Sequence, residues 1–258
     1  MMNDLMDSVI CGDNCEVMRQ WHDECVDLVV TSPPYDNLRT YGGHEWDFYG
    51  VAWNIARTLK QGGVLAWNVA DATVDGSEPG TSFRQALHFQ KLGLRIHDTM
   101  IWHKPNALPL NANRYEGAWE YVFIFSKGKP ATWNPIREKS INGGKSSTGT
   151  QISRDGSKRQ KSGNGKPCNE TKVMQNLWQF PVGGGKTGHP APFPSKMAAM
   201  HVQSWSNPGD LVMDPFAGSG TTLKAAKEMG RRFVGIEVNP DYVKICENRL
   251  MQDVLRFD

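Results

Sequence analysis

Two apolar runs in this chain end abruptly on segments rich in proline or glycine. Leu28-Val29-Val30 leads into Ser32-Pro33-Pro34-Tyr35, and Leu211-Val212-Met213 leads into residues 214–222, which read Asp-Pro-Phe-Ala-Gly-Ser-Gly-Thr-Thr. Each run predicts a buried strand, and each following segment predicts the loop beyond its carboxyl end. In open α/β sheets, ligands bind beyond those ends. We therefore expect two binding loops at one edge of a sheet.

The rest of the chain alternates between helical and extended patterns. Apolar residues recur at helical spacing in 47–59, and continuous apolar runs at 64–69, 94–102 and 119–125 predict strands. We expect Gly62-Gly63 to stop the helix over 47–59, and Ser195 to cap a second helix over 195–205. Strands that alternate with helices predict an α/β fold with a doubly wound, mostly parallel sheet.

One segment departs from this pattern in composition and in charge. Residues 137–172 contain nine Lys or Arg and three acidic residues, a net charge of +6 in a chain whose total is +2. Few apolar residues anchor this stretch, so we expect a loop-rich basic insert over 129–176 between segments 1–128 and 177–258. Such asymmetry favours a polyanionic partner, although a merely solvated loop is the alternative.

Several classes of protein are disfavoured. The five cysteines form no C-x-x-C pair, so neither zinc-type spacing nor another metal site is indicated. No apolar run approaches the roughly 20 residues of a membrane span, so no membrane partner is expected. Residues 1–7 carry two acids and no base, which is wrong for a signal peptide. We expect a cytoplasmic protein with reduced thiols.

The segment that begins at Asp214 combines an acid with a glycine-rich turn. Gly218 and Gly220 allow a tight turn and a close approach to a ligand, and the N–H groups of a following helix would face that ligand. The opening carboxylate would repel a pyrophosphate and attract an ammonium. Glu237 ends the next strand at the spacing typical of a carboxylate that accepts bonds from ribose hydroxyls. An amino-acid-bearing nucleoside therefore fits better than a dinucleotide.

The run Gly183 to Gly188 imitates a phosphate-binding loop, but its spacing favours a flexible loop.

The proline-rich loop offers acceptors and an aromatic ring. Two consecutive prolines fix two φ angles and remove two N–H donors, while their carbonyls remain as acceptors. Ser32 adds a hydroxyl, and Tyr35 adds a ring that can stack on a base. The combination suits an exocyclic amino group beside an aromatic face, whereas Pro-Pro alone would indicate only a stiff turn.

These two segments resemble the motifs of DNA methyltransferases that act on exocyclic amino groups, of the permuted type with the catalytic half first. Such enzymes carry [DNS]-P-P-[YFW] after one strand and D-P-F-x-G-S-G-T after another. Further matches lie in nearly the whole chain outside the insert, among them Gly12-Asp13, Ile101-Trp102-x-Lys104, Glu120 to Gly128, His189-Pro190, and Arg249-Leu250. The resemblance implies a Rossmann-like methyltransferase sheet, with a catalytic half over 1–128, target recognition in the insert 129–176 and a cofactor-binding half over 177–258.

The resemblance also implies S-adenosyl-L-methionine as the cofactor. Its expected contacts are Asp214, Phe216, Gly218 and Gly220 for the methionine part, Glu237 for the ribose, Asp13 for the adenine, and Ser195 and Lys196 near the methionine carboxylate. Thr221 is also expected to bind the cofactor. The expected catalytic residues are Ser32, Pro33, Pro34 and Tyr35. Ser32 and the Pro33 carbonyl would take the hydrogens of the target amine, and the proton would leave to water or to Asp36.

The expected substrate is a base flipped out of double-stranded DNA. In the resembling family, Ser in the first motif position usually accompanies cytosine N4, and Asp accompanies adenine N6, so we expect cytosine N4 with adenine N6 as the alternative. The insert residues expected to contact phosphates are Lys145, Arg154, Lys158, Arg159, Lys161 and Lys166. A homodimer and a cognate restriction endonuclease remain open as partners. The rival functions are RNA or protein-amide methylation and a nucleic-acid-binding protein without catalysis.

Overall fold

The main sheet contains eight strands, ordered β1-β12-β11-β2-β3-β5-β4-β10. The computed structural model describes residues 6–35, 46–107, 113–146, 148–161, 163–182 and 194–251. In sheet order the strands are β1 (Ser8–Cys11), β12 (Arg232–Glu237), β11 (Leu211–Asp214), β2 (Val26–Thr31), β3 (Leu59–Val69), β5 (Trp119–Ser126), β4 (Arg95–His103) and β10 (Leu177–Gln179). Within this sheet only β5 runs against the others, because β3–β5 and β4–β5 are its antiparallel pairs.

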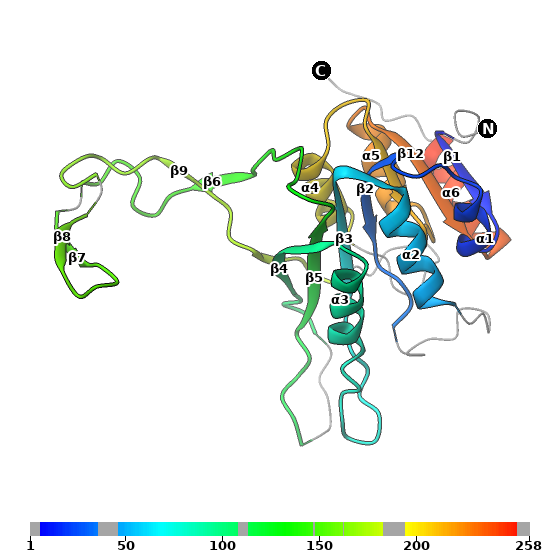
Figure 1. Cartoon of the computed structure of the whole chain (residues 1–258), viewed down its shortest axis with the longest axis horizontal. Helices are drawn as coiled ribbons and strands as arrows, with labels where there is room; N and C mark the ends of the chain where they lie inside the picture. The colour runs from blue at the N-terminus through cyan, green and yellow to red at the C-terminus, as the bar shows by residue number, and fades with distance from the viewer. Residues whose placement is uncertain are drawn as a thin grey trace. The chain divides into compact units, whose positions relative to one another are not determined.

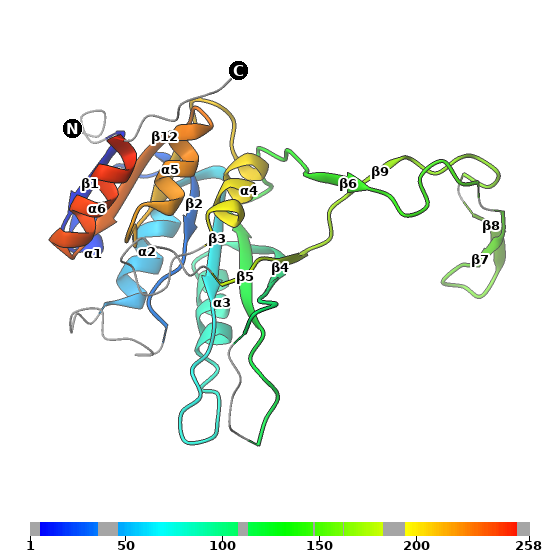
Figure 2. The same cartoon turned by 180° about the vertical axis from the view of Figure 1, so that it is seen from behind.

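Helices cover both faces of the sheet (Figures 1 and 2). One layer consists of α1 (Asn14–Arg19), α2 (Phe48–Thr58) and α3 (Thr81–Lys91), and the other of α4 (Ser195–Trp205), α5 (Thr221–Glu228) and α6 (Pro240–Met251). The predicted doubly wound, mostly parallel α/β fold is therefore confirmed. Among the described residues, no helix combines the length and apolar character needed to cross a bilayer.

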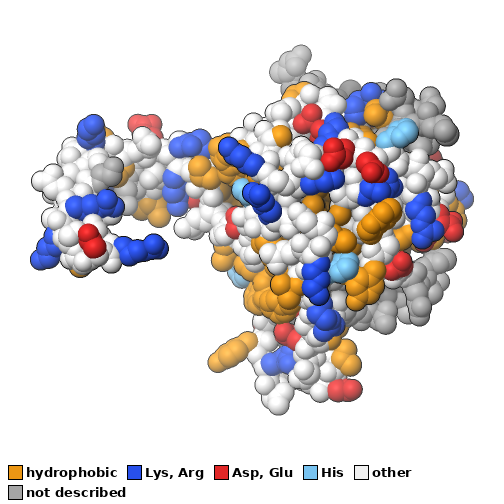
Figure 3. Space-filling model, in the orientation of Figure 1, with side chains coloured by type: hydrophobic (Ala, Val, Ile, Leu, Met, Phe, Trp, Pro, Cys, Tyr) orange, Lys and Arg blue, Asp and Glu red, His pale blue; other side chains and the backbone are white. Residues whose placement is uncertain are grey.

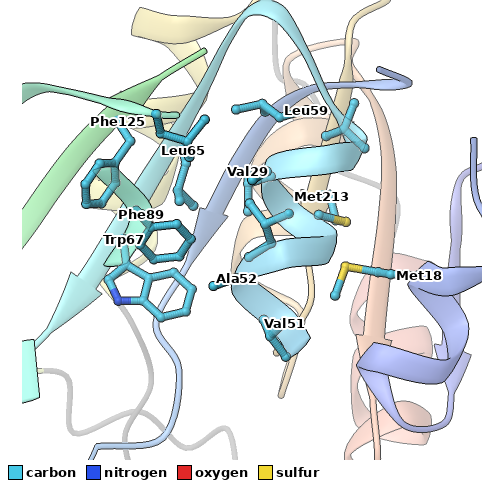
Figure 4. Packing of buried hydrophobic residues seen from close by; sticks show 14 of the residues in the cluster. Met18, Val29, Val51, Ala52, Leu59, Leu65, Trp67, Phe89, Phe125 and Met213 are labelled. Carbon is cyan, nitrogen blue, oxygen red and sulfur yellow. The ribbon is translucent and has the colours of Figure 1, made fainter. Parts of the chain in front are cut away.

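The core explains why the strands read as continuous apolar runs. All four residues of β11 are buried, as are five of the six in β2, because helices lie on both faces. On the α1–α3 side, Trp67 of β3 packs against Phe89 of α3, whose ring lies 5.0 Å from that of Phe125 (Figure 4). Burying such a side chain stabilises the fold by about 1.5–3 kcal/mol.

Two predicted element boundaries are wrong. Gly62-Gly63 lie inside β3 and do not stop α2, which ends at Thr58. A Cβ on Gly63 would lie 3.0 Å from the carbonyl oxygen of Asp27, in the neighbouring strand, so the glycine serves a close backbone approach beside an irregularity in the β2–β3 register. Ser195 is the first helical residue of α4, and Pro194 occupies the N-cap position.

The basic insert is a separate compact unit over Pro135–Gln175. It contains two antiparallel strand pairs, β6 (Arg137–Lys139) with β9 (Thr171–Val173), and β7 (Thr150–Ile152) with β8 (Lys158–Gln160). The expected irregular loop is thus partly strand. Ile141 and Ile152 are exposed, which accords with the scarcity of apolar anchors in the sequence. The roles expected for segments 1–128, 129–176 and 177–258 stay predictions.

Candidate active site

The two loops found in the sequence lie side by side. Strands β2 and β11 pair in parallel, with Val29 opposite Met213, so both loops leave the same edge of the sheet. The Thr31 hydroxyl donates a 2.7 Å hydrogen bond to the Asp214 carboxylate. Since Ser32 directly follows Thr31, the proline-rich loop begins next to the acid of the glycine-rich turn.

Asp214 is a buried carboxylate, 5% exposed. Burial raises its pKa to about 6, although hydrogen bonds from the Thr31 hydroxyl and from the Phe216 backbone N–H, at 3.1 Å, act in the opposite direction. An ammonium ligand would stabilise the ionised form of a buried carboxylate that has no cationic partner. The Asp214 carboxylate therefore fits the amino group of the expected cofactor.

The turn after Asp214 requires glycine at two positions. Gly218 has φ 49° and Gly220 has φ 76°, both in the left-handed region. A Cβ on Gly220 would also lie 2.2 Å from the Cys246 sulfur. Gly220 is the N-cap residue of α5, and Thr221 begins the helix in a buried position. The helix N-terminus consequently starts directly beyond the acidic turn.

Glu237 and Asp13 lie at neighbouring strand ends. Cys11 of β1 pairs with Glu237 of β12, and the Gly12 N–H donates to the Glu237 carbonyl at 3.0 Å. The Glu237 carboxylate accepts the N–H groups of Gly218 and Asn239, each at 2.9 Å. A carboxylate has about four acceptor sites, so capacity for ribose hydroxyls remains.

The exposed Asp13 side chain caps α1 by accepting the Glu16 N–H at 2.9 Å. It therefore faces solvent at the same edge as Glu237.

Ser195 and Lys196 lie on the first turn of α4, and Lys196 is exposed. Arg249 of α6 donates to the Ser195 hydroxyl at 3.2 Å and to the Thr221 hydroxyl at 3.0 Å, which joins the N-termini of α4 and α5. No role was predicted for Arg249 from the sequence, although it lies in one of the matching segments.

The proline-rich loop is tied inward by hydrogen bonds. The hydroxyls of Ser32 and Tyr35 lie 2.7 Å apart, and that of Tyr35 donates to the Glu120 carboxylate at 2.8 Å. Burial of the hydroxyl, followed by the charge of Glu120, raises the pKa of Tyr35 well above its ordinary value of 10. Tyr35 therefore stays neutral, and its partly exposed ring is fixed in orientation. Pro33 is buried and Pro34 is half-buried.

Three further side chains join this loop and were not assigned from the sequence. Asn68 donates to Tyr35 and to Glu120, and Lys104 forms an ion pair with Glu120 at 2.9 Å. A polar Asn68 near the end of an apolar strand was the available signal. Lys104 and Glu120 lie in matching segments, but only the sheet topology brings them to Tyr35.

Some expected features lie outside the described residues. They are Asp36, the run Gly183 to Gly188, and His189-Pro190. Among the residues that are described, no group of three or more His, Cys, Asp or Glu side chains is placed to bind a metal ion.

The six expected phosphate contacts of the insert are all exposed. Figure 3 shows Lys and Arg side chains, in blue, on the surface of the molecule. Lys158 and Arg159 lie on β8, and Arg154 lies in the turn that connects β7 with β8. Lys145, Lys161 and Lys166 lie in the adjoining turns, where their backbone N–H groups are hydrogen-bonded. The nucleic-acid-binding role of these residues, like the roles of the catalytic and cofactor-binding residues, stays a prediction.

Comparison with known proteins identifies similar chains. The family model described as DNA methylase, for N6 and N4 methyltransferases, matches residues 26–248. The chain is 44% identical over 241 residues to the orphan methyltransferase M.BamHII of Bacillus amyloliquefaciens, covering 89% of this chain and 90% of the relative. It is 28% identical to the type II methyltransferase M.SmaI of Serratia marcescens, covering 95% and 90% of the two chains.

Solved structures agree in fold. The PvuII DNA methyltransferase, described as cytosine-N4-specific, superposes with a TM-score of 0.69 at 22% identity, covering 96% of this chain and 88% of that one. A Thermus thermophilus protein solved in complex with S-adenosyl-L-methionine gives a TM-score of 0.64 at 27% identity, with 94% and 92% coverage.

Proposed function

Because this chain belongs to the N6/N4 DNA methylase family and is an S-adenosylmethionine-dependent DNA methyltransferase, we propose that it methylates cytosine N4 in a specific sequence of double-stranded DNA. The supporting observation is the Thr31–Asp214 hydrogen bond, which joins the proline-rich loop to the acidic glycine turn. A donor bound at the turn and an amine bound at the loop would then be neighbours, and in-line positioning supplies much of the acceleration.

Residues at three strand ends would bind the methyl donor. When bound, S-adenosylmethionine supplies a methyl group already activated by attachment to a sulfonium. Asp214 would pair with its ammonium, Glu237 with its ribose hydroxyls and Asp13 with its adenine amino group. The methionine part would also contact Phe216, Gly218, Gly220 and Thr221, with Ser195 and Lys196 nearer its carboxylate.

The catalytic loop would orient the target amine. The lone pair of an exocyclic amine is delocalised into the ring, so the nitrogen is a poor nucleophile. Accepting its two hydrogens on the Ser32 hydroxyl and the Pro33 carbonyl favours a pyramidal nitrogen with a usable lone pair. The Tyr35 ring, whose hydroxyl is anchored to Glu120, would stack on the base, an interaction worth about 1–3 kcal/mol. Pro34 keeps the loop rigid.

Ser32 favours cytosine N4, and the structurally similar PvuII enzyme is described as specific for that atom. Adenine N6 is the alternative amine. Incubating unmethylated DNA with the protein and cofactor, followed by mass analysis of the nucleosides, decides between them. We expect N4-methylcytosine; N6-methyladenine would select the alternative.

The insert would neutralise DNA phosphates through its exposed lysines and arginines. Double-stranded DNA is the proposed partner, and a homodimer and a cognate endonuclease remain to be tested by sedimentation and by pull-down. A protein that bound both cofactor and DNA but transferred no methyl group would instead be a non-catalytic nucleic-acid-binding member of the fold.

A further inference from the structure

A closed chain of hydrogen bonds runs behind the Ser32 hydroxyl. Its members come from four adjacent strands: Ser32 and Tyr35 follow β2, Asn68 lies in β3, Glu120 in β5, and Lys104 follows β4. Because β5 is antiparallel, its beginning lies at the edge where β3 and β4 end, with Glu120 opposite Trp102. A carboxylate from the start of a strand thereby reaches a site otherwise built from strand ends.

The number of donors in this chain sets the direction of each hydrogen bond. Tyr35 has one hydroxyl hydrogen and donates it to Glu120 at 2.8 Å. The 2.7 Å bond between Ser32 and Tyr35 must then use the Ser32 hydrogen. The Ser32 oxygen consequently keeps its lone pairs for other donors; Asn68 approaches it only at 3.4 Å.

Glu120 and its ion pair maintain this direction. Glu120 is 8% exposed, and the Lys104 ammonium lies 2.9 Å from its Oε1 while Tyr35 and Asn68 donate to its Oε2. The Asn68 amide cannot be turned over, since its oxygen would then lie against the carboxylate. The Tyr35 hydrogen thus points toward Glu120 and the Ser32 hydrogen toward Tyr35, away from the free side of Ser32.

We propose that Glu120 is a positioning residue that makes the Ser32 hydroxyl a hydrogen-bond acceptor only, so that the loop selects an amino group over a carbonyl group on the target base. This inference rests on the proposed function, in which Ser32 binds the target amine. An outward Ser32 hydrogen would oppose the amine hydrogens and would favour a base with a carbonyl oxygen at that place.

The test is Glu120→Gln. Lys104 would attract the new amide oxygen, leaving the amide NH₂ in the place of Oε2. There it would donate to Tyr35 and to Asn68, whose amide no longer faces a carboxylate and would turn its oxygen toward the new donor. The Tyr35 hydrogen would turn to Ser32, and the Ser32 hydrogen would point outward. With unmethylated plasmid DNA and tritium-labelled cofactor, we expect kcat to fall by about tenfold or more, while the KM for DNA and the Kd for cofactor change less than about twofold.

The double variant Glu120→Gln/Lys104→Met gives the decisive comparison. Without the ammonium, the amide oxygen introduced at position 120 is free to accept from Tyr35 again, so most of the lost kcat should return. A purely structural role predicts that the second substitution makes the enzyme worse. The proposal is overturned if the double variant is as slow as Glu120→Gln or slower.

Two more variants complete the test. Tyr35→Phe removes the hydroxyl that links Glu120 to Ser32, so it should lower kcat to a similar extent as Glu120→Gln. Combined with Glu120→Gln, it should add little further loss of kcat. Wild-type kcat in Tyr35→Phe would overturn the inference even if Glu120→Gln failed to fold. Glu24→Gln, which changes an exposed carboxylate paired with the half-buried Lys127, is the matched control and should keep wild-type kcat. No transfer by the wild-type protein would refute the proposed function itself, whereas wild-type kcat in Glu120→Gln would refute only the role of Glu120.

Discussion

The Asp214 carboxylate must be ionised to attract a cationic ligand, but burial raises its pKa to about 6. In the ligand-free protein this shift makes a contribution to stability that is full below pH 3.8 and lost as the pH rises through about 6. A bound ammonium favours the ionised form and should reverse part of that loss. Cofactor binding and proton release at Asp214 are therefore linked.

We predict that cofactor affinity weakens in acid. Below about pH 6 the Kd for S-adenosylmethionine should rise by up to about tenfold per pH unit, because binding then requires Asp214 to lose a proton. Isothermal titration calorimetry between about pH 5 and 8 measures this. Asp214→Asn should bind weakly with little pH dependence. A wild-type Kd that is constant over the range would contradict the linkage.

His201 of α4 should make folding sensitive to acid. Its ring is fully buried beside Trp178, neither nitrogen has a hydrogen-bond partner in the described structure, and burial lowers its pKa to about 3. Unfolding lets it take up a proton, so stability falls as the pH drops from 6.5 toward 3, by up to about 1.4 kcal/mol per pH unit. Urea unfolding should show that the wild type loses more stability than His201→Leu as the pH falls. Parallel pH profiles for the two proteins would rule this out.

Packing between elements depends on Gly235 in β12. A Cβ there would lie 2.4 Å from a Leu223 methyl carbon of α5 and 2.9 Å from the Ala217 Cβ in the glycine-rich turn. Gly235→Ala should therefore lower the free energy of unfolding by about 1–3 kcal/mol through overpacking, and displacement of the turn should weaken cofactor binding. Gly117→Ala, which meets nothing within 4 Å, is the matched control. Equal denaturation midpoints for the two variants would contradict this account.

Across the whole molecule, charge is divided between a mildly acidic body and a basic insert. Changing Lys158, Arg159 and Lys161 to Gln should weaken DNA binding at low salt. If all three contact phosphates, the slope of log K against log salt should become shallower by about 2–3 units. Fluorescence anisotropy over a salt series measures this, and cofactor affinity serves as the control. An unchanged slope would mean that these residues are only a solvated surface.

Local patterns in the chain were sufficient for the fold class and for the two loops. Continuous apolar runs such as Leu211–Met213 need burial on both faces. The segments after such runs, Ser32 to Tyr35 and Asp214 to Gly220, gather their functional groups within a few consecutive positions. Parallel strands end at one edge, so the meeting of these loops also followed from pattern alone. The helix boundary at Gly62-Gly63 was wrong because Gly62 is required by a left-handed φ of 80° within β3 and Gly63 by a close approach to the Asp27 carbonyl oxygen. Neither requirement depends on the end of a helix.

The partners of the catalytic loop depend on long-range pairing. Glu120 is 85 residues from Tyr35 in the chain, and it reaches the site because β5 is antiparallel between β3 and β4. Asn68 and Lys104 arrive in the same way from their own strands. Propensity and periodicity act over a few residues, whereas hydrogen-bond direction in a buried cluster depends on every donor and acceptor that folding brings together.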